Sequence, residues 1–242
     1  MRDQKRMIIE AAAALELERE PSVNLHSFPI HLEYSEGALT LEGEVEGIMA
    51  KKKALEVAAA LPGVSGIVDR LRLVPARRME DGEIRDHVCN ALMAENLLSS
   101  CAIWAMVKGK PEAIRDAVQG AEGTIDVEIN DGVVLLNGAV PSLSAKRVAG
   151  VLAWWVPGSR DVVNGIEVAP PEEDNDDEVV DAIRLVLEKN PFINPSQIRV
   201  TCRNYSVTLE GIVKSEIQRQ MAEADCWYVF RVDRVINRLL VE

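Results

Sequence analysis

Three basic residues occupy the same position in a segment that the sequence repeats, and they are the first candidates for chemistry: Lys51, Lys146 and Arg219. Each follows the expected start of a helix, after a strand that ends in Gly-x-Val. Cations at such a position could bind a phosphate or a lipid headgroup, although they oppose the positive end of the helix dipole. The structural alternative is that each methylene stem covers the sheet edge while the charge reaches water. Both interpretations remain open.

Two pairs of adjacent aromatic residues form the second candidate: Trp154 with Trp155, and Trp227 with Tyr228. They fall at the same two successive positions of the repeated helix, where the first copy has two alanines. Adjacent residues on a helix point about 100° apart, so both rings of a pair can hardly enter one core. We expect one ring of each pair to cover an inter-module or partner contact. Extension of the core by both rings is the alternative.

The sequence contains no motif for catalysis or for metal binding that we can identify. G-x-S-x-G, H-E-x-x-H and G-x-G-x-x-G are all missing, so we expect no enzymatic activity. The four cysteines form no C-x-x-C pair, and three histidines are too few to complete zinc sites with them. The acidic run Asp174–Glu178 lacks the glycine and glutamate of an EF-hand loop. We expect no metal and no cofactor, and we interpret the cysteines as reduced core residues.

The elements that position these residues belong to an internal repeat of three copies. In each copy an apolar strand leads to a helix, a turn and a last strand, and the spacing is the same without a gap. Chance rarely keeps such a register three times. The residue types that precede the helices favour N-caps: Gly47, Ser142 and Ser215. Small residues four apart would let each helix lie close on its sheet: Ala54, Ala58, Ala149, Ala153, Ala222 and Cys226.

Each copy reads as helix, hairpin, helix and strand, which predicts an α+β fold of three tandem αββαβ modules. We expect each module to have a small mixed three-stranded sheet covered by two helices, with a right-handed crossover that makes the last strand parallel to the second. The first module spans 1–75, the second 79–169, and the divergent third 175–242. Proline followed by charged residues marks both linkers.

Two local predictions concern the first helix and the hairpins. Residues Asp3–Glu20 form an amphipathic helix whose apolar residues are Met7, Ile8, Ala11, Ala14 and Leu15. Glu36 with Gly37 and Asp131 with Gly132 should make tight turns with glycine at positive φ. The third hairpin has Tyr205 in place of glycine, so its turn should differ in type or place only Asn204 in the left-handed region.

The second module carries an insertion at about 99–123, between its first helix and its hairpin. Residues Glu112–Gln119 follow a proline and are predicted to form an additional short helix. Lys108–Lys110 is predicted to be an exposed turn. Since insertions map to loops more readily than to cores, we expect this segment on accessible surface.

The assembled pattern resembles the bacterial OsmY and nodulation (BON) domain. The resemblance rests on the Gly-x-Val strand end, the alanine-bearing helix, the Pro-Gly turn and the Asp or Asn before the last strand. It covers most of the chain apart from the insertion and the linkers. In the third copy Phe230 and Arg231 replace Pro-Gly. The resemblance implies compact tandem modules without catalytic residues, associated with phospholipid attachment, osmotic or envelope stress, and interaction or ligand sensing.

Charge narrows the choice of partner. The net charge of −12 is spread over all three modules, so no basic nucleic-acid domain is expected. An anionic membrane would repel this body except at local basic clusters. We therefore favour an interaction scaffold that binds a protein or self-associates; a phospholipid-surface or small-ligand or ion-binding module is the alternative. No signal peptide and no apolar run of membrane-spanning length is present, so we expect a cytoplasmic protein.

Overall fold

The computed structural model describes residues 2–116, 120 and 122–242. The chain divides into two units, Met1–Val74 and Pro75–Glu242. The first unit is the first module, and the second unit contains the second and third modules together. The second linker thus joins two modules that belong to one unit.

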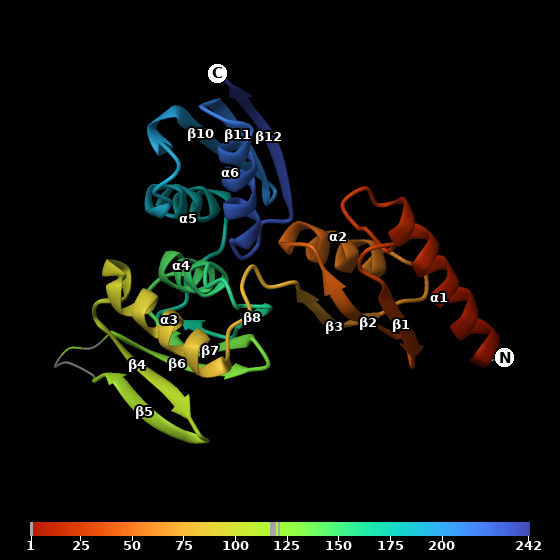
Figure 1. The fold of residues 1–242 in the computed structure, drawn as a ribbon, viewed down its shortest axis with the longest axis horizontal. Helices are drawn as coiled ribbons and strands as arrows, with labels where there is room; N and C mark the ends of the chain where they lie inside the picture. Colours follow the sequence, from red (N-terminus) through yellow and green to blue (C-terminus); the bar gives the residue numbers. More distant parts are fainter. Residues whose placement is uncertain (1, 117–119, 121) are drawn as a thin grey trace. The chain divides into compact units, whose positions relative to one another are not determined.

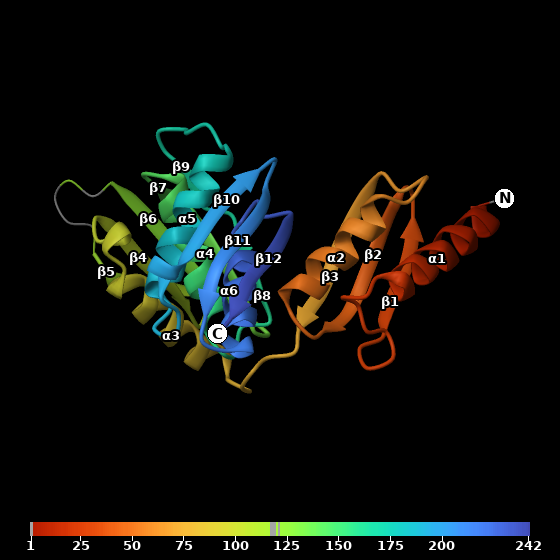
Figure 2. The same ribbon diagram turned by 90° about the horizontal axis from the view of Figure 1, so that it is seen from above.

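The first module has the predicted order of elements: α1 (Arg2–Arg19), β1 (Ile30–Ser35), β2 (Ala38–Val45), α2 (Ile48–Ala59) and β3 (Gly66–Leu73). β1 is antiparallel to β2, and β3 is parallel to β2 (Figures 1 and 2). Strand residues alternate between faces, so one face buries Leu39, Leu41 and Leu71 completely. Ala54 and Ala58 of α2 are also fully buried, because side chains this small let the helix lie close on the sheet.

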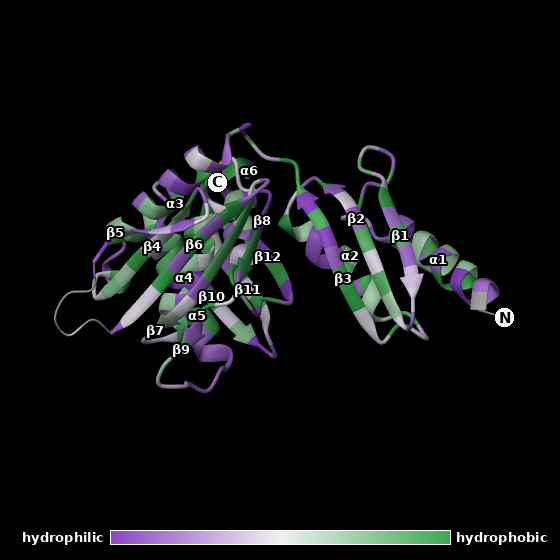
Figure 3. Ribbon diagram, turned by 90° about the horizontal axis from the view of Figure 1, so that it is seen from below, coloured by the Kyte–Doolittle hydropathy of each residue, from purple (hydrophilic) through white to green (hydrophobic). Residues whose placement is uncertain are grey.

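The first helix forms as predicted, but it buries a different stripe from the one that its largest apolar residues suggest. Ile9, Ala13 and Leu17 face the core, with exposed fractions of 6%, 0% and 0%. Met7, Ile8 and Leu15 remain exposed at 62%, 61% and 49%. The helix has two apolar stripes, and its own module covers only one of them. Figure 3 shows hydrophobic residues distributed along α1 among hydrophilic ones.

The third module repeats the first: α5 (Asp176–Lys189), β10 (Ile198–Arg203), β11 (Ser206–Val213), α6 (Glu216–Tyr228) and β12 (Arg234–Val241), with a short 3₁₀ turn at Pro195–Gln197. β11 is antiparallel to β10 and parallel to β12. Ser215 caps α6, since its hydroxyl accepts the Gln218 N–H at 3.2 Å, while the Gln218 side chain accepts the Lys214 N–H at 2.9 Å.

The second module carries a larger sheet than predicted. Its elements are α3 (Asp81–Ala94), a 3₁₀ turn (Asn96–Leu98), β4 (Cys101–Val107), β5 (Lys110–Arg115), β6 (Gly123–Asn130), β7 (Val133–Val140), α4 (Leu143–Trp154), β8 (Asp161–Asn164) and β9 (Glu167–Val168). The predicted three-stranded arrangement is present as β6, β7 and a last strand interrupted between β8 and β9, both parallel to β7. The insertion adds β4 and β5, which gives a sheet of six strands.

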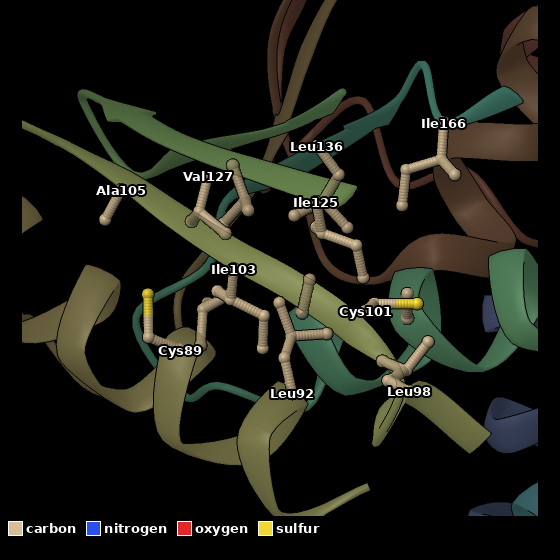
Figure 4. Packing of buried hydrophobic residues seen from close by; sticks show 14 of the residues in the cluster. Cys89, Leu92, Leu98, Cys101, Ile103, Ala105, Ile125, Val127, Leu136 and Ile166 are labelled. Carbon is tan, nitrogen blue, oxygen red and sulfur yellow. The ribbon is translucent and has the colours of Figure 1, made fainter. Parts of the chain in front are cut away.

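The insertion corrects two predictions. No helix begins at Glu112: residues 110–115 form β5, and 117–119 lie outside the described residues. The turn at Lys108 and Gly109 has φ values of 51° and 77°, which suits a two-residue hairpin and returns the chain as a strand. β4 is not a surface loop, because it pairs parallel to β6 and fully buries Ile103. Figure 4 shows Ile103 and Cys101 of β4 among the buried residues of α3, β6 and β7.

The hairpin turns confirm the glycine prediction and contradict the tyrosine prediction. Gly37 and Gly132 have φ values of 95° and 72°, but Tyr205 also lies at +57°. A non-glycine residue in this region costs about 1–2 kcal/mol. Two contacts explain why Tyr205 tolerates it: the Asp176 carboxylate accepts its N–H at 2.8 Å, and its hydroxyl donates to the Asp174 carbonyl at 3.1 Å. The guanidinium of Arg231 also lies 4.3 Å from the ring centroid.

Candidate functional site

The three basic residues of the repeated helix position have three different environments. Lys51 is 5% exposed, and its Nζ donates to the Leu71 carbonyl at 2.7 Å and lies 3.0 Å from Asp69. Lys146 places its Nζ 5.2 Å from the centroid of the Phe230 ring. Arg219 pairs with Glu216 in the preceding turn at 2.6 Å. The three side chains therefore do not share one environment, although they occupy the same position of the repeat.

One position of the last strand, which is Asp69, Asn164 or Asn237 in the three modules, explains why the basic residues have different environments. Asn164 and Asn237 donate through Nδ2 to the backbone carbonyls of Lys146 and Arg219, at 2.8 and 2.9 Å, and so fasten the strand to the helix. The first module has Asp69 at this position, and a carboxylate cannot donate a hydrogen bond. There the Lys51 side chain makes the connection instead. The role of Lys51 is accordingly structural in this fold, whereas the side chains of Lys146 and Arg219 make other contacts.

The aromatic pairs meet across the boundary between the second and third modules. Trp154 stacks on Tyr228 with ring centroids 5.7 Å apart and an angle of 26° between the planes. The indole N–H of Trp155 donates to the Asp225 carboxylate at 3.1 Å. Trp227 is 2% exposed. The second-module pair thus contacts the third module with both rings, while the third-module pair contributes Tyr228 to the contact and buries Trp227.

A stripe along α4 makes the contact continuous. Val151 is 1% exposed and packs within the apolar core of the third module, although it belongs to the second. The buried Arg147 pairs with Asp174 at 2.6 Å and donates to the Phe230 carbonyl at 3.3 Å. In Figure 1 α4 lies between its own sheet and the helices α5 and α6 of the third module. The stripe therefore consists of residues at helical spacing: Arg147, Val151, Trp154 and Trp155.

The sequence contains a signal for this contact that the repeat analysis did not use. The equivalent stripe on α2 of the first module reads Lys52, Glu56, Ala59 and Ala60. Glu56 and both alanines are exposed. Comparing the outer stripe copy by copy, rather than the aromatic pairs alone, would have indicated which module docks on another.

A pocket opens beside this contact, with a volume of about 370 Å³. Trp155 contributes one wall from the second module, and the other walls come from α6 and from the segment after α5. Asp225 is 4% exposed at the pocket, and its carboxylate accepts hydrogen bonds from Trp155 at 3.1 Å and from the Asn190 side chain at 2.7 Å. Burial raises the pKa of Asp225 to about 6. The principal lining residues are Trp155, Asn190, Phe192, Met221, Asp225 and Tyr228.

The remaining candidate groups are possible metal ligands and the cysteine thiols. Within the residues that it covers, no three His, Cys, Asp or Glu side chains are grouped to hold a metal ion. The four cysteines are free; three of them are buried and Cys202 is half-buried. Burial raises the pKa of Cys89 to about 11 and of Cys202 to about 12. Thiols with such pKa values are poor nucleophiles. No described helix is long and apolar enough to cross a membrane.

The repeated αββαβ geometry and the family comparison agree. The family described as the BON domain matches residues 3–75, 112–170 and 175–242. The chain belongs to the BON domain family and contains three tandem copies. The second match begins inside β5, so α3 and β4 lie outside it. The structure nevertheless places α3 where α1 and α5 lie in their modules, which shows that the insertion separates the first helix of this copy from the rest.

The comparisons with curated proteins and with solved structures support no further assignment. The search of curated proteins gives no match. Two solved structures of the CdsD protein from the type III secretion system of Chlamydia trachomatis resemble the chain at 14% identity. The first covers 96% of this chain and 96% of its own with a TM-score of 0.25, and the second covers 96% and 92% with a TM-score of 0.24. Scores this low carry no argument about function.

Proposed function

We propose that this chain is a non-enzymatic scaffold whose helix faces bind protein, and that its first module binds a second copy of the chain. The observation that carries the proposal is the apolar stripe left exposed on α1. Met7, Ile8 and Leu15 are 62%, 61% and 49% exposed, and full burial of such side chains is worth roughly 1.5–3 kcal/mol each. The second and third modules supply the precedent within the chain, since they pack helix against helix.

The residues of α1 favour antiparallel self-pairing. Centred on Ala11, an antiparallel pair would place Met7 of one copy opposite Leu15 of the other, and the small central residue would allow close approach. The same register would bring the exposed Lys5 of one copy near the exposed Glu18 of the other. Charges of opposite sign at both ends would select this orientation over a parallel one. An interface of one helix pair is small, so we expect weak, concentration-dependent association.

Sedimentation equilibrium from low to high micromolar concentration tests the proposal. We expect the wild-type mass to approach twice the 26.6 kDa of the monomer as concentration rises. Ile8→Glu should abolish this rise, because it places a charge in the centre of the apolar stripe. The matched control is Ile217→Glu, which changes a similarly exposed isoleucine on α6, at 70% exposure, and should leave association intact.

Charge exchange tests the orientation. Glu18→Lys should weaken association, because Lys5 of the other copy would then face a like charge. Adding Lys5→Glu should restore it. A wild-type chain that stays monomeric at high micromolar concentration, or an Ile8→Glu variant that associates as well as the wild type, would overturn self-association through α1.

A further inference from the structure

We propose that the pocket between α4 and the third module is a binding site for a small organic ammonium ion that carries an apolar group. The proposal does not depend on self-association through α1. The site is complete only when the second and third modules are packed together, because one wall comes from Trp155 and the others from the third module.

The walls determine the apolar part of the ligand. Trp155, Phe192 and Tyr228 supply aromatic surface and Met221 supplies a flexible apolar side chain. A volume of about 370 Å³ suits a compact molecule rather than a polymer. Phe192 is 64% exposed, so this wall has room to adjust to an entering ligand. An aromatic or branched alkyl group therefore fits the pocket.

The acidic residue that lines the pocket, Asp225, determines the charge of the ligand. Asp225 is the acidic residue of the lining, and among the described residues that form the pocket none is basic. Its two carboxylate oxygens each accept one hydrogen bond, from Trp155 and Asn190, and each retains further acceptor capacity. Both of these donors are neutral, so the negative charge at the pocket is not balanced by its hydrogen-bond partners. A positively charged group would balance it.

Aromatic rings and a carboxylate favour the same class of ligand. The faces of Trp, Tyr and Phe rings attract cations, and this attraction strengthens when the cation leaves water. An ammonium ion with an apolar substituent can therefore contact the rings with both of its parts. An inorganic cation would lack the apolar part and would leave most of the pocket unfilled.

The binding experiment compares matched probes by isothermal titration calorimetry on the full chain near pH 8. Benzylammonium carries the charge and the ring, benzyl alcohol is its neutral counterpart, and benzyltrimethylammonium carries the charge without N–H donors. We expect benzylammonium to bind at least about tenfold more tightly than benzyl alcohol, because only the ion interacts with the carboxylate charge. Tight binding of the trimethylated probe as well would assign the contact to the rings and the charge rather than to N–H donors.

Three substitutions test whether the probes bind in this pocket. Asp225→Asn should strongly reduce the preference for the charged probes and leave only the contribution of the rings, and circular dichroism should show that this variant folds. Phe192→Ala should weaken all probes, whereas Phe230→Ala, an exposed phenylalanine outside the lining, should weaken none. A fall in pH through about 6 should weaken benzylammonium but not benzyl alcohol, because the carboxylate is then protonated.

Three outcomes would overturn the proposal. The first is equal affinity for benzylammonium and benzyl alcohol. The second is no measurable binding of any probe at millimolar concentration. The third is an Asp225→Asn variant that folds and prefers the charged probes as strongly as the wild type does.

Discussion

At the scale of residues, one position of the last strand shows how a change from an amide to a carboxylate alters the role of a neighbouring basic residue. Asp69, Asn164 and Asn237 each accept the N–H of the residue two places on, at 2.9, 3.3 and 3.2 Å. Asn164 and Asn237 also donate a hydrogen bond to the helix through their amide groups. The Asp69 carboxylate cannot donate, so in the first module the Lys51 side chain joins the helix to the last strand. A recurring basic residue therefore has a structural role in one copy that it lacks in the others.

Asp225 gives the first residue-scale prediction. Burial raises its pKa from 3.8 to about 6, so the folded state holds this proton more tightly than the unfolded state. Its contribution to stability is fully present below about pH 4 and is lost as the pH rises through about 6. A difference of this size corresponds to about 3 kcal/mol at most. The free energy of unfolding from urea titrations should therefore contain this pH-dependent component.

The control for this prediction is Asp225→Asn, which cannot titrate. Subtracting the variant's unfolding free energy from that of the wild type should leave a difference that becomes less favourable to the wild type between about pH 4 and pH 8. A difference independent of pH would show that the folded-state pKa of Asp225 is close to its ordinary value.

At the scale of elements, the hairpins are fastened by the first residues of the preceding helices. Asp81 accepts the N–H groups of Asp131 and Gly132 at 3.0 and 2.9 Å. Asp176 accepts those of Asn204 and Tyr205 at 2.7 and 2.8 Å. These hydrogen bonds hold the pKa of Asp176 below its usual range, chiefly through the Tyr205 N–H. The helix therefore holds the turn in place even where glycine is missing.

The prediction at this scale compares two carboxylates. Asp176→Ala should lower the free energy of unfolding by roughly 1.5–3 kcal/mol, because it removes hydrogen bonds to a charged group and leaves Tyr205 at positive φ. Asp81→Ala should cost less, since Gly132 adopts its conformation without strain. Introducing Tyr205→Gly beside Asp176→Ala should recover part of the loss. Equal costs in chemical denaturation for the two alanine variants would argue against a strained tyrosine turn.

At the scale of the whole molecule, three copies of one module give two units. The α4 stripe that contacts the third module combines Arg147 with one apolar and two aromatic residues, while its counterpart on α2 is charged or small. Packing between two copies therefore depends on four outer residues of one helix, which the αββαβ fold itself does not constrain.

The prediction for the whole molecule concerns the joint unfolding of the second and third modules. Val151→Asp should destabilise their unit by roughly 3–5 kcal/mol, because it buries a charge without a partner. Hydrogen exchange should then increase in both modules and stay unchanged in residues 2–74. Glu56→Val, at the equivalent exposed position of the first module, is the matched control and should have little effect. Unchanged exchange in the third module would contradict the shared core.

The sequence by itself determined the modules and their topology, because repeated spacing, small helix residues and alternating strands are local patterns that burial within one module enforces. It also indicated the aromatic contact. Only the tertiary structure decided which stripe of α1 is buried, that the insertion extends a sheet, and that Tyr205 adopts a glycine-like turn. It also decided that Asp225 closes a pocket with Trp155. Each of these features depends on contacts between residues that are distant in the chain. Asp176, for example, stabilises the positive φ of Tyr205 by accepting its N–H. The pattern of neighbouring residues in the sequence does not show which distant side chain will make such a contact.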